Sequence, residues 1–414
     1  GYKVQVLEYN ARPGGRNWSM YGGDSYTDIG GVTQNVKFAP GLYFNPGPWR
    51  LPHHHHAILY YCKLFNVALE TFTMTNYNAY IHSTKSFGGK PVRRREIDMD
   101  FSGYAAELLA KATTKDKLDV ALGKDEKDGL LQILKFWGGL NKNYEYRKGP
   151  SASELRGYKV DPGGGLAPLP EDSDPLPMKQ LFTSDMWMFL EGRSYDYQTQ
   201  LFEPVGGMGM IGKAFGQQLN GLIKYNCKVT AIQQDGKGVT ATYVDTKKGG
   251  APQTVHADWC VCTIPATVLS QIPMNVGGPM RNAINSLSYE SSFKVGLQFK
   301  RRFWEEDDGI YGGISYTDQP ITNISYPSTG FFKNGPAVLL GGYGYGNNLT
   351  DFSFAAMSPE NQVKAAVEQG AKVHPQYKKQ FDNGVAVAWH KVPFTLGCAG
   401  SWTEKVRAKH YNNM

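Results

Sequence analysis

The hydrophobic and polar positions of this 414-residue chain change their period several times. The chain opens on a short apolar strand at residues 3–7, which is followed by Glu8 and by a glycine turn at residues 12–16. A strand that ends in a carboxylate is typical of the second strand of a dinucleotide-binding unit, so this opening predicts an α/β domain. In such units a glycine-rich phosphate loop precedes the carboxylate by about 20 residues. We therefore expect that loop to lie upstream of Gly1.

The next part of the chain alternates between helical and strand periodicity. Residues 53–65 carry apolar side chains three and four positions apart, which predicts a helix. Residues 67–97 alternate apolar and polar side chains and predict strands of an antiparallel sheet. Helical spacing returns at residues 98–146 and 178–192. Between these two parts, residues 149–177 are rich in Pro, Gly and Ser and predict a long surface connection.

The remainder of the chain predicts mainly strands. Its apolar runs are short, rich in β-branched and aromatic residues, and separated by turn residues. The expected elements are a helix at 211–222, strands at 224–233, 238–244 and 257–265, long strands through 291–346, and a helix at 359–372.

Composition narrows the function classes. The chain is 41% hydrophobic and 20% charged, as in a globular protein, which excludes a disordered chain or a coiled coil. The longest apolar stretch, residues 259–272, is too short to span a membrane and contains Pro265. The net charge of +7 is dispersed along the chain rather than gathered on one segment, so we expect no nucleic-acid partner.

Neither the cysteines nor the histidines predict a metal site. The five cysteines have no paired zinc-type spacing. Cys260 and Cys262 are two apart in an expected strand and would share one face, so we interpret the cysteines as buried free thiols. The four histidines at 53–56 would point around most of a helix and could not face one metal ion together.

Two further features admit alternative interpretations. Residues 207–212 match G-x-G-x-x-G and open a helix, but Glu203 and Pro204 precede them where a phosphate loop needs a buried strand. We favour a turn that lets the helix approach the cofactor domain closely. Lys294 is a charge inside an otherwise apolar strand. The pattern leaves open whether it reaches solvent or is held inside for a function.

Several motifs in order carry a resemblance to a known family. The chain resembles the flavin-containing amine oxidase superfamily over essentially its whole length, and within it is most similar to the L-amino acid oxidases. The matching residues are Glu8, Arg12, Pro13-Gly-Gly-Arg16, Gly47-Pro-Trp-Arg-Leu-Pro52, Pro204-Val-Gly-Gly-Met208, Lys294 and Arg302-Phe-Trp-Glu305.

The resemblance implies an FAD cofactor and assigns residues to its parts. Glu8 would bind the adenosine ribose, and Gly15 and Arg16 would lie along the pyrophosphate. Val229 would meet the adenine through its backbone. The turn beside the isoalloxazine would consist of Gly47, Pro48, Trp49 and Arg50.

The resemblance also implies an amino-acid substrate and O₂. Arg50 matches the family arginine that holds the substrate carboxylate, and Tyr343 matches the tyrosine that assists it. A planar guanidinium can pair with a carboxylate through two parallel hydrogen bonds, which suits this role. Lys294 matches the lysine that holds a water near flavin N5. The implied products are a 2-oxo acid, ammonium and H₂O₂.

The implied architecture is a mixed α/β (α+β) fold with three parts. A Rossmann-like FAD-binding domain would comprise residues 1–35 and 204–290, and a mixed-sheet substrate domain residues 36–97 and 291–400. A helical insert at 98–203 would wall the substrate entrance. Family members close the FAD domain with an Ala-Gly-Glu or Ala-Gly-Asp box and a Gly-Trp near their C-terminus. This chain contains neither, so we expect it to be incomplete at both ends.

Two other functions stay open on the sequence. One is an amine or polyamine oxidase, which needs no carboxylate-binding arginine. The other is a non-catalytic protein that has lost its flavin and acts as a scaffold. A homodimer is also left open, and peroxide production favours a secreted or periplasmic location.

Overall fold

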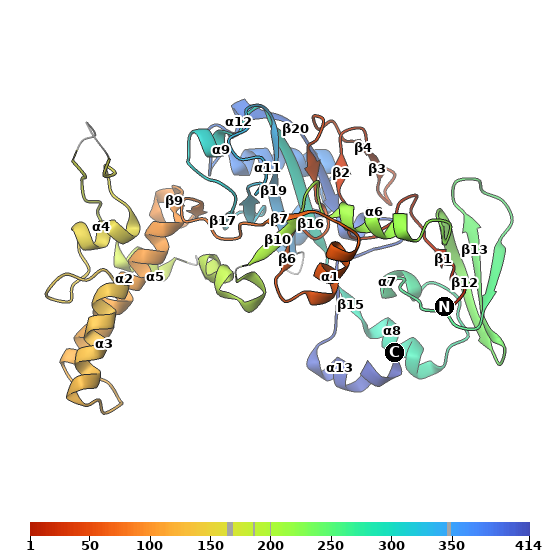
Figure 1. Cartoon of the computed structure of the whole chain (residues 1–414), viewed down its shortest axis with the longest axis horizontal. Coiled ribbons are helices and arrows are strands. Elements are labelled where there is room, and N and C mark those ends of the chain that lie inside the picture. Colours follow the sequence, from red (N-terminus) through yellow and green to blue (C-terminus); the bar gives the residue numbers. More distant parts are fainter. Residues whose placement is uncertain (164–168, 185–186, 199, 346–348) are drawn as a thin grey trace.

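The computed structural model describes residues 1–163, 169–184, 187–198, 200–345 and 349–414. A mixed sheet lies at its centre, a small antiparallel sheet at one end and a helical arm at the other (Figure 1). None of the described helices is both long and apolar enough to cross a membrane.

The central sheet has seven strands in the order β20-β16-β19-β18-β17-β8-β9. Their bounds are β8 Tyr80–His82, β9 Val92–Arg93, β16 Ser292–Phe299, β17 Ile314–Thr317, β18 Asn323–Ser325, β19 Ala337–Tyr345 and β20 Phe381–Ala388. The long strands expected within residues 291–346 are thereby confirmed. So is the helix expected at 359–372, since α11 (Pro359–Gly370) packs on β16, β19 and β20.

The central strand β16 separates two environments. Its partners on either side are β19 and β20, both antiparallel to it. Phe293, Val295 and Leu297 belong to one buried cluster with residues of α11. Because side chains alternate along a strand, Lys294 points to the opposite face of the sheet. The alternation along β16 therefore places the Lys294 side chain on the face of the sheet opposite α11.

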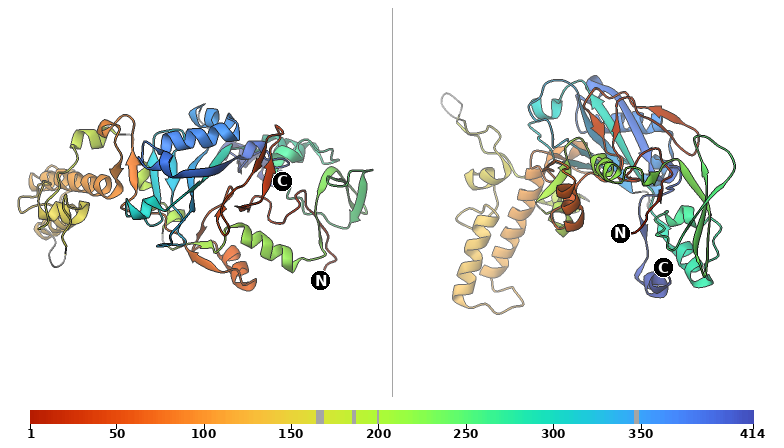
Figure 2. Two further views of the ribbon diagram at one scale, coloured as in Figure 1. Left: turned by 90° about the horizontal axis from the view of Figure 1, so that it is seen from above. Right: turned by 45° about the vertical axis from the view of Figure 1, so that its right-hand side comes forward.

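A second group of elements carries the opening of the chain. β1 (Val6–Leu7) pairs in parallel with β11 (Ile223–Lys224), as expected for a dinucleotide-binding unit. Next to it lies an antiparallel sheet of β12 (Cys227–Asp235), β13 (Gly238–Asp245) and β14 (Gln253–Ala257). The N-terminus lies at this end of the molecule (Figures 1 and 2).

A three-stranded sheet links the two groups. It has the order β6-β10-β7, with β6 Leu51–Pro52, β7 Leu69–Thr71 and β10 Leu201–Pro204. The helices α1 (His56–Leu64) and α6 (Gly209–Gln218) pack beside it, which confirms both expected helices with shifted ends.

The glycine pattern at residues 207–212 allows a close contact. A Cβ on Gly212 would lie 2.7 Å from the Cα of Gly14, and a Cβ on Gly14 would lie 3.1 Å from the Cα of Gly212. Neither position therefore admits a side chain without a backbone shift. The contact agrees with the interpretation of this glycine pattern as a close approach of the helix. The reason given for that interpretation was wrong, because the largely buried strand β10 does precede the glycines.

The helices between residues 94 and 183 form an arm that projects from the central sheet (Figures 1 and 2). The helices expected within residues 98–146 are confirmed, although the first begins earlier. They are α2 (Arg94–Thr114) and α3 (Lys124–Trp137), and they are followed by α4 (Pro150–Arg156), α5 (Met178–Thr183) and the 3₁₀ helices η2 (Trp187–Arg193) and η3 (Tyr195–Tyr197).

The surface connection expected at residues 149–177 is only partly correct. Its first part forms α4, which Pro150 begins and in which Ser153 and Arg156 are buried. The Arg156 side chain donates to the buried Asp100 on α2, so α4 packs firmly on the insert. Residues 164–168 lie outside the described part of the chain.

Two expectations about the strand at 257–265 were wrong. Residues 258–264 form no regular element, and no described strand pairs with them. Cys260 and Cys262 are consequently exposed, and Cys398 is partly exposed, whereas Cys62 and Cys227 are buried as expected. An apolar run predicts burial only where a neighbouring strand covers it.

Short elements complete the described fold. Residues 67–97 form β7, β8 and β9, but β7 pairs with β10 in a separate sheet rather than with β8. The remaining elements are β2 Met20–Tyr21, β3 Ser25–Thr27, β4 Thr33–Asn35, β5 Tyr43–Phe44, η1 Phe87–Gly89, α7 Ala266–Leu269, α8 Gly278–Ser286, β15 Ser288–Tyr289, α9 Phe303–Glu306, α10 Leu349–Ala356, α12 Tyr377–Gln380, η4 Trp389–Lys391, β21 Gly400–Ser401, α13 Glu404–His410 and η5 Tyr411–Asn413.

Candidate active site

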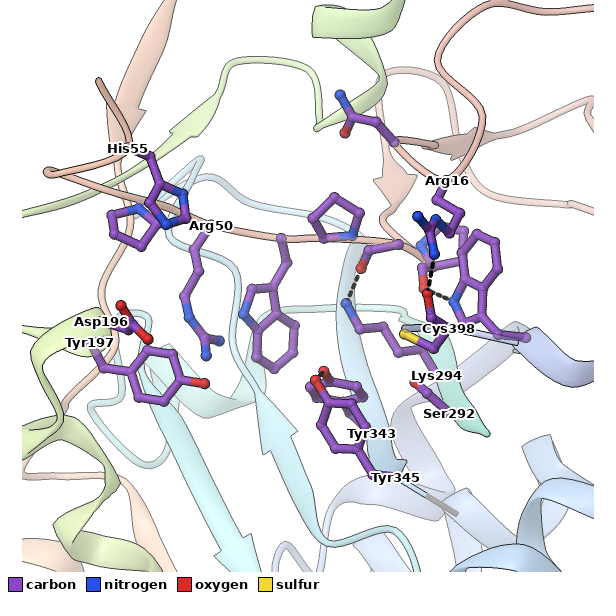
Figure 3. A pocket seen from close by; sticks show the side chains of 17 residues that line it. Arg16, Arg50, His55, Asp196, Tyr197, Ser292, Lys294, Tyr343, Tyr345 and Cys398 are labelled. Atoms are coloured by element: carbon purple, nitrogen blue, oxygen red, sulfur yellow. Dashed lines mark hydrogen bonds between the residues drawn. The ribbon is translucent and has the colours of Figure 1, made fainter. Parts of the chain in front are cut away.

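A cavity of about 470 Å³ lies on the Lys294 face of the central sheet (Figure 3). Its walls come from segments far apart in the sequence: the glycine turn, residues 46–50, the ends of β16 and β19, and the segment after β20. The residues whose side chains Figure 3 labels are Arg16, Arg50, His55, Asp196, Tyr197, Ser292, Lys294, Tyr343, Tyr345 and Cys398.

Lys294 is a buried ammonium without an acidic partner among the described residues. It is 3% exposed, donates to the carbonyl oxygen of Gly47, and lies 4.5 Å from the Trp49 ring. Burial, together with the positive charge of Arg50, lowers the pKa of Lys294 to about 7. The lysine therefore does not reach solvent, so the first of the two interpretations is wrong. That it is held inside for a function stays a prediction.

The turn at residues 46–50 is held closely against its neighbours. A Cβ on Gly47 would lie 2.0 Å from the backbone oxygen of Arg16, so glycine is needed there. The indole of Trp389 donates to the oxygen of Pro46 over 2.8 Å. The Arg16 side chain in turn donates to the backbone oxygen of Cys398. These contacts give the turn a fixed position beside the cavity.

Tyr343 lies opposite Lys294 in the register of β16 and β19. The ammonium of Lys294 lies 4.7 Å from its ring centre, and its hydroxyl donates to that of Tyr345. The Trp49 ring meets the Tyr343 ring edge-on at 5.0 Å. Burial raises the pKa of Tyr343, which therefore remains a neutral hydrogen-bonding group at physiological pH.

Arg50 follows the same turn and faces the cavity. Its guanidinium carbon lies 4.1 Å from the ring centre of Tyr197 and 5.1 Å from that of Trp49 (Figure 3). No carboxylate of the described chain lies within 4 Å of its nitrogens. A guanidinium that has aromatic neighbours and no anionic partner is suited to bind a carboxylate from outside.

Glu8, Gly15 and Val229 lie away from the cavity, on the opening unit. The backbone nitrogen of Cys227 on β12 donates to the oxygen of Glu8 over 2.8 Å, which brings Val229 of the same strand near the end of β1. One carboxylate oxygen of Glu8 accepts from the backbone and side chain of Asn10. Gly15 has φ of 53° and an open side-chain direction. The turn then leads directly to Arg16 in the cavity wall.

Sequence reasoning missed several cavity residues. Tyr345 could have been found, because it is two positions after Tyr343 and strand alternation directs both to one face. Tyr197, Trp389 and Cys398 come from segments with no motif of their own, so only tertiary packing brings them to the cavity.

The histidines at 53–56 make separate contacts. His54 pairs with Asp196 over 3.1 Å, whereas His55 lines the cavity. Across the described ranges, no three His, Cys, Asp or Glu side chains gather as metal ligands would. The expectation of no metal site stays a prediction.

Comparison with known proteins identifies the family. Residues 1–412 match the family of flavin containing amine oxidoreductases. The chain belongs to this family. That result confirms the resemblance stated from the motifs, and FAD is the cofactor that the family implies.

Relatives of this chain include L-amino acid oxidases. The L-amino acid oxidase of Cerastes cerastes is 30% identical over 349 residues, which cover 82% of this chain and 61% of the relative. The L-amino-acid oxidase of Siganus canaliculatus is 26% identical, over 97% of this chain and 72% of its own length. The chain thus spans less than two thirds of the Cerastes protein.

Solved structures show the same fold. A wild-type putrescine oxidase bound to putrescine superposes with a TM-score of 0.57 at 14% identity, covering 98% of this chain and 84% of its own. Cyclohexylamine oxidase from Brevibacterium oxydans gives a TM-score of 0.58 at 13% identity, covering 100% and 85%. The mixed α/β fold class expected from the sequence is confirmed.

The cavity fits a flavin. Its walls are largely apolar and aromatic, as a flat ring system requires, and the buried Lys294 offers an ammonium with no acidic partner among the described residues. Arg16 lies at the cavity end nearest the glycine turn, where a phosphate would need a cation. The second carboxylate oxygen of Glu8 makes no hydrogen bond with any described residue. It is therefore available to a ribose.

Proposed function

We propose that this chain carries the active site of an FAD-dependent L-amino acid oxidase. The reaction would convert an L-amino acid, water and O₂ into a 2-oxo acid, ammonium and H₂O₂. One observation carries the proposal. The guanidinium of Arg50 faces the cavity that Lys294 also lines, and no acidic residue of the described chain pairs with it. The L-amino acid oxidases among the relatives support the same assignment.

Arg50 would bind the substrate carboxylate. Its donors can form two parallel hydrogen bonds with the two carboxylate oxygens, which fixes the orientation of Cα. Tyr343 would add a neutral donor from the facing strand once its hydroxyl turns from Tyr345 to the substrate. An amine lacks the carboxylate, so this pair is what would distinguish an amino-acid substrate from its decarboxylated amine.

FAD would be held along the path from Glu8 to the cavity. Glu8 would bind the ribose, Gly15 and Arg16 the pyrophosphate, and Val229 the adenine. The turn formed by Gly47, Pro48, Trp49 and Arg50 would lie beside the ring system. When bound, FAD supplies the two-electron oxidation and the transfer of those electrons to O₂.

Lys294 would hold a water or exchange a proton at its ammonium. A lysine with a pKa of about 7 is divided between its charged and neutral forms near neutral pH, so it can both donate and accept. The aromatic rings of Trp49 and Tyr343 keep bulk water away from it. This would concentrate the proton exchange at one buried atom.

The proposal includes the division into domains that the resemblance implies. Residues 1–35 and 204–290 would form the FAD-binding domain, 36–97 and 291–400 the substrate domain, and 98–203 the insert. Of the insert, only Asp196 and Tyr197 line the cavity in the described part of the chain. The insert would therefore border the substrate entrance through its last residues.

Peroxide release from paired substrates tests the function. The FAD-loaded enzyme is assayed with an L-amino acid and with the amine obtained by its decarboxylation, for aromatic, aliphatic and basic side chains in turn. The proposal expects a higher kcat/KM for the amino acid of at least one pair. A preference for the amine in every pair would instead identify an amine oxidase. Absence of the visible absorbance of oxidised flavin after reconstitution would contradict both.

A further inference from the structure

Tyr197 lies under the guanidinium of Arg50. The 4.1 Å between the guanidinium carbon and the ring centre is the shorter of the two ring contacts of Arg50, and Tyr197 also lines the cavity (Figure 3). A guanidinium that stacks on a ring uses its face and leaves its edge free. The N–H donors of Arg50 therefore remain available for a ligand in the cavity.

The segment that carries Tyr197 is fixed to the segment that carries Arg50. His54 pairs with Asp196 over 3.1 Å, and the Tyr195 ring lies 4.6 Å from the His54 ring. Just beyond, β6 and β10 pair with Pro52 opposite Leu201. These contacts join the 3₁₀ helix η3, which carries Tyr197, to the backbone just after Arg50.

Nothing else in the described structure fixes the direction of the guanidinium. It has no carboxylate within salt-bridge distance, and its contact with Trp49, the preceding residue, is longer at 5.1 Å. An arginine side chain is flexible, and immobilising it on binding would weaken affinity. A ring that holds it in place beforehand reduces this loss.

We propose that Tyr197 is a positioning residue that orients Arg50 for the substrate carboxylate. The inference rests on the proposed function, because it assumes that Arg50 binds the carboxylate. The ring face carries the effect, so the hydroxyl of Tyr197 is dispensable. Tyr197 also belongs to the helical insert, and it is through this residue that the insert contributes to substrate recognition.

Three variants of the FAD-loaded enzyme test the proposal. Tyr197→Leu removes the ring and should raise the KM for the amino acid about 3- to 30-fold, with kcat changed much less. Tyr197→Phe keeps the ring and should remain within about 2-fold of the unsubstituted enzyme. Tyr411→Leu serves as the control, because the Tyr411 ring also faces an arginine, Arg407 at 5.2 Å, but neither residue lines the cavity. It should leave KM unchanged.

A double-mutant cycle separates positioning from a structural role. When Arg50 is replaced by Ala, adding Tyr197→Leu should cause no further rise in KM, because there is no guanidinium left to orient. Titration calorimetry with the 2-oxo acid should show the same pattern in its dissociation constant. Equal effects of Tyr197→Leu with and without Arg50, or a Phe variant as impaired as the Leu variant, would overturn the proposal.

The two proposals fail differently. If Arg50→Ala alone leaves amino-acid oxidation unchanged, the proposed function is wrong, and the orientation of Arg50 has no consequence for it. If Arg50→Ala impairs amino-acid oxidation while Tyr197→Leu does not, the function stands and Tyr197 is only a wall of the cavity.

Discussion

Lys294 and Tyr343 face each other across β16 and β19, with the lysine ammonium 4.7 Å from the centre of the tyrosine ring. The ring face offers partial negative charge to the ammonium, yet it replaces only part of the lost hydration. The lysine pKa falls to about 7 for that reason. The buried charge therefore lowers the stability of the folded protein.

Replacing Lys294 by Met should stabilise the protein most at low pH. Below pH 7 the folded protein carries the buried charge, whereas above it the folded lysine is neutral and the unfolded lysine still binds a proton up to its ordinary pKa of 10.5. The stability of the unsubstituted protein should thus rise between pH 7 and 10.5, by at most about 1.4 kcal/mol per pH unit. The increase in the free energy of unfolding that Lys294→Met causes should therefore become smaller across that window.

Urea unfolding of the apoprotein at about pH 6, 8 and 10 measures this effect. Lys300→Met, at an exposed position just beyond β16, is the matched control. A gain from Lys294→Met that is independent of pH would show that the lysine keeps its ordinary pKa in the folded state.

The facing pair of Glu203 and Glu70 should make the stability of the folded protein depend on pH in the opposite direction. The two are opposite each other on β10 and β7, and each has a buried carboxylate oxygen without a hydrogen-bond partner in the described structure. Burial first, and the charge of Glu70 second, raise the pKa of Glu203 to about 8. The folded protein then holds a proton that the unfolded chain loses above its ordinary pKa of 4.5.

The stability contributed by that proton should fall as pH rises from 4.5 to 8. Glu203→Gln keeps the shape of the side chain without the charge. Its free energy of unfolding should therefore rise relative to that of the unsubstituted protein across this window, by at most about 1.4 kcal/mol per pH unit. Glu154→Gln, at an exposed position, is the control. Thermal unfolding at about pH 5 and pH 8 checks the prediction, and equal shifts of Tm at both values would disprove it.

Asp100 should anchor the helical insert. It is fully buried and accepts hydrogen bonds from the Tyr146 hydroxyl at 2.6 Å, from Arg156 Nε at 2.7 Å and from the Leu176 backbone at 2.7 Å. Asp100→Ala leaves the Arg156 charge buried and without its closest partner, which should cost about 3–5 kcal/mol. Urea unfolding, with hydrogen exchange of α2 and α4, localises the loss to the insert.

A surface pair provides the comparison for Asp100. Glu171→Ala breaks the exposed pair of Glu171 with Lys159 and should change stability little. If the two substitutions have similar effects, the buried network around Asp100 does not hold the insert together.

The sequence predicted those parts of the fold that local patterns determine. The apolar run around Lys294 predicted the strand β16, although it left open whether the lysine is buried. Helical spacing predicted α3 and α11, because these periods depend on neighbours along the chain. The motif around Gly47 located the turn beside the cavity. In each case the local pattern and the tertiary structure demand the same residue types.

The rest depended on contacts that no local pattern records. Tyr197 and Trp389 reach the cavity only through the pairing of distant strands, and neither belongs to a motif. Cys260 lies in an apolar run that predicts a buried strand, but it is exposed because nothing in the described chain pairs with that run. Burial is a property of the neighbours as well as of the residue.

The most direct test of the account is the kcat/KM of Arg50→Ala for an L-amino acid and for its decarboxylated amine. Loss of a charge-assisted bidentate contact of about 2–4 kcal/mol should lower kcat/KM for the amino acid about 30- to 1000-fold and leave that for the amine nearly unchanged. Arg301→Ala, which removes an arginine from the surface pairs with Glu306 and Asp307, should affect neither. An Arg50→Ala enzyme that retains its kcat/KM for the amino acid, or that loses both activities equally, would contradict the assignment of Arg50 to the carboxylate.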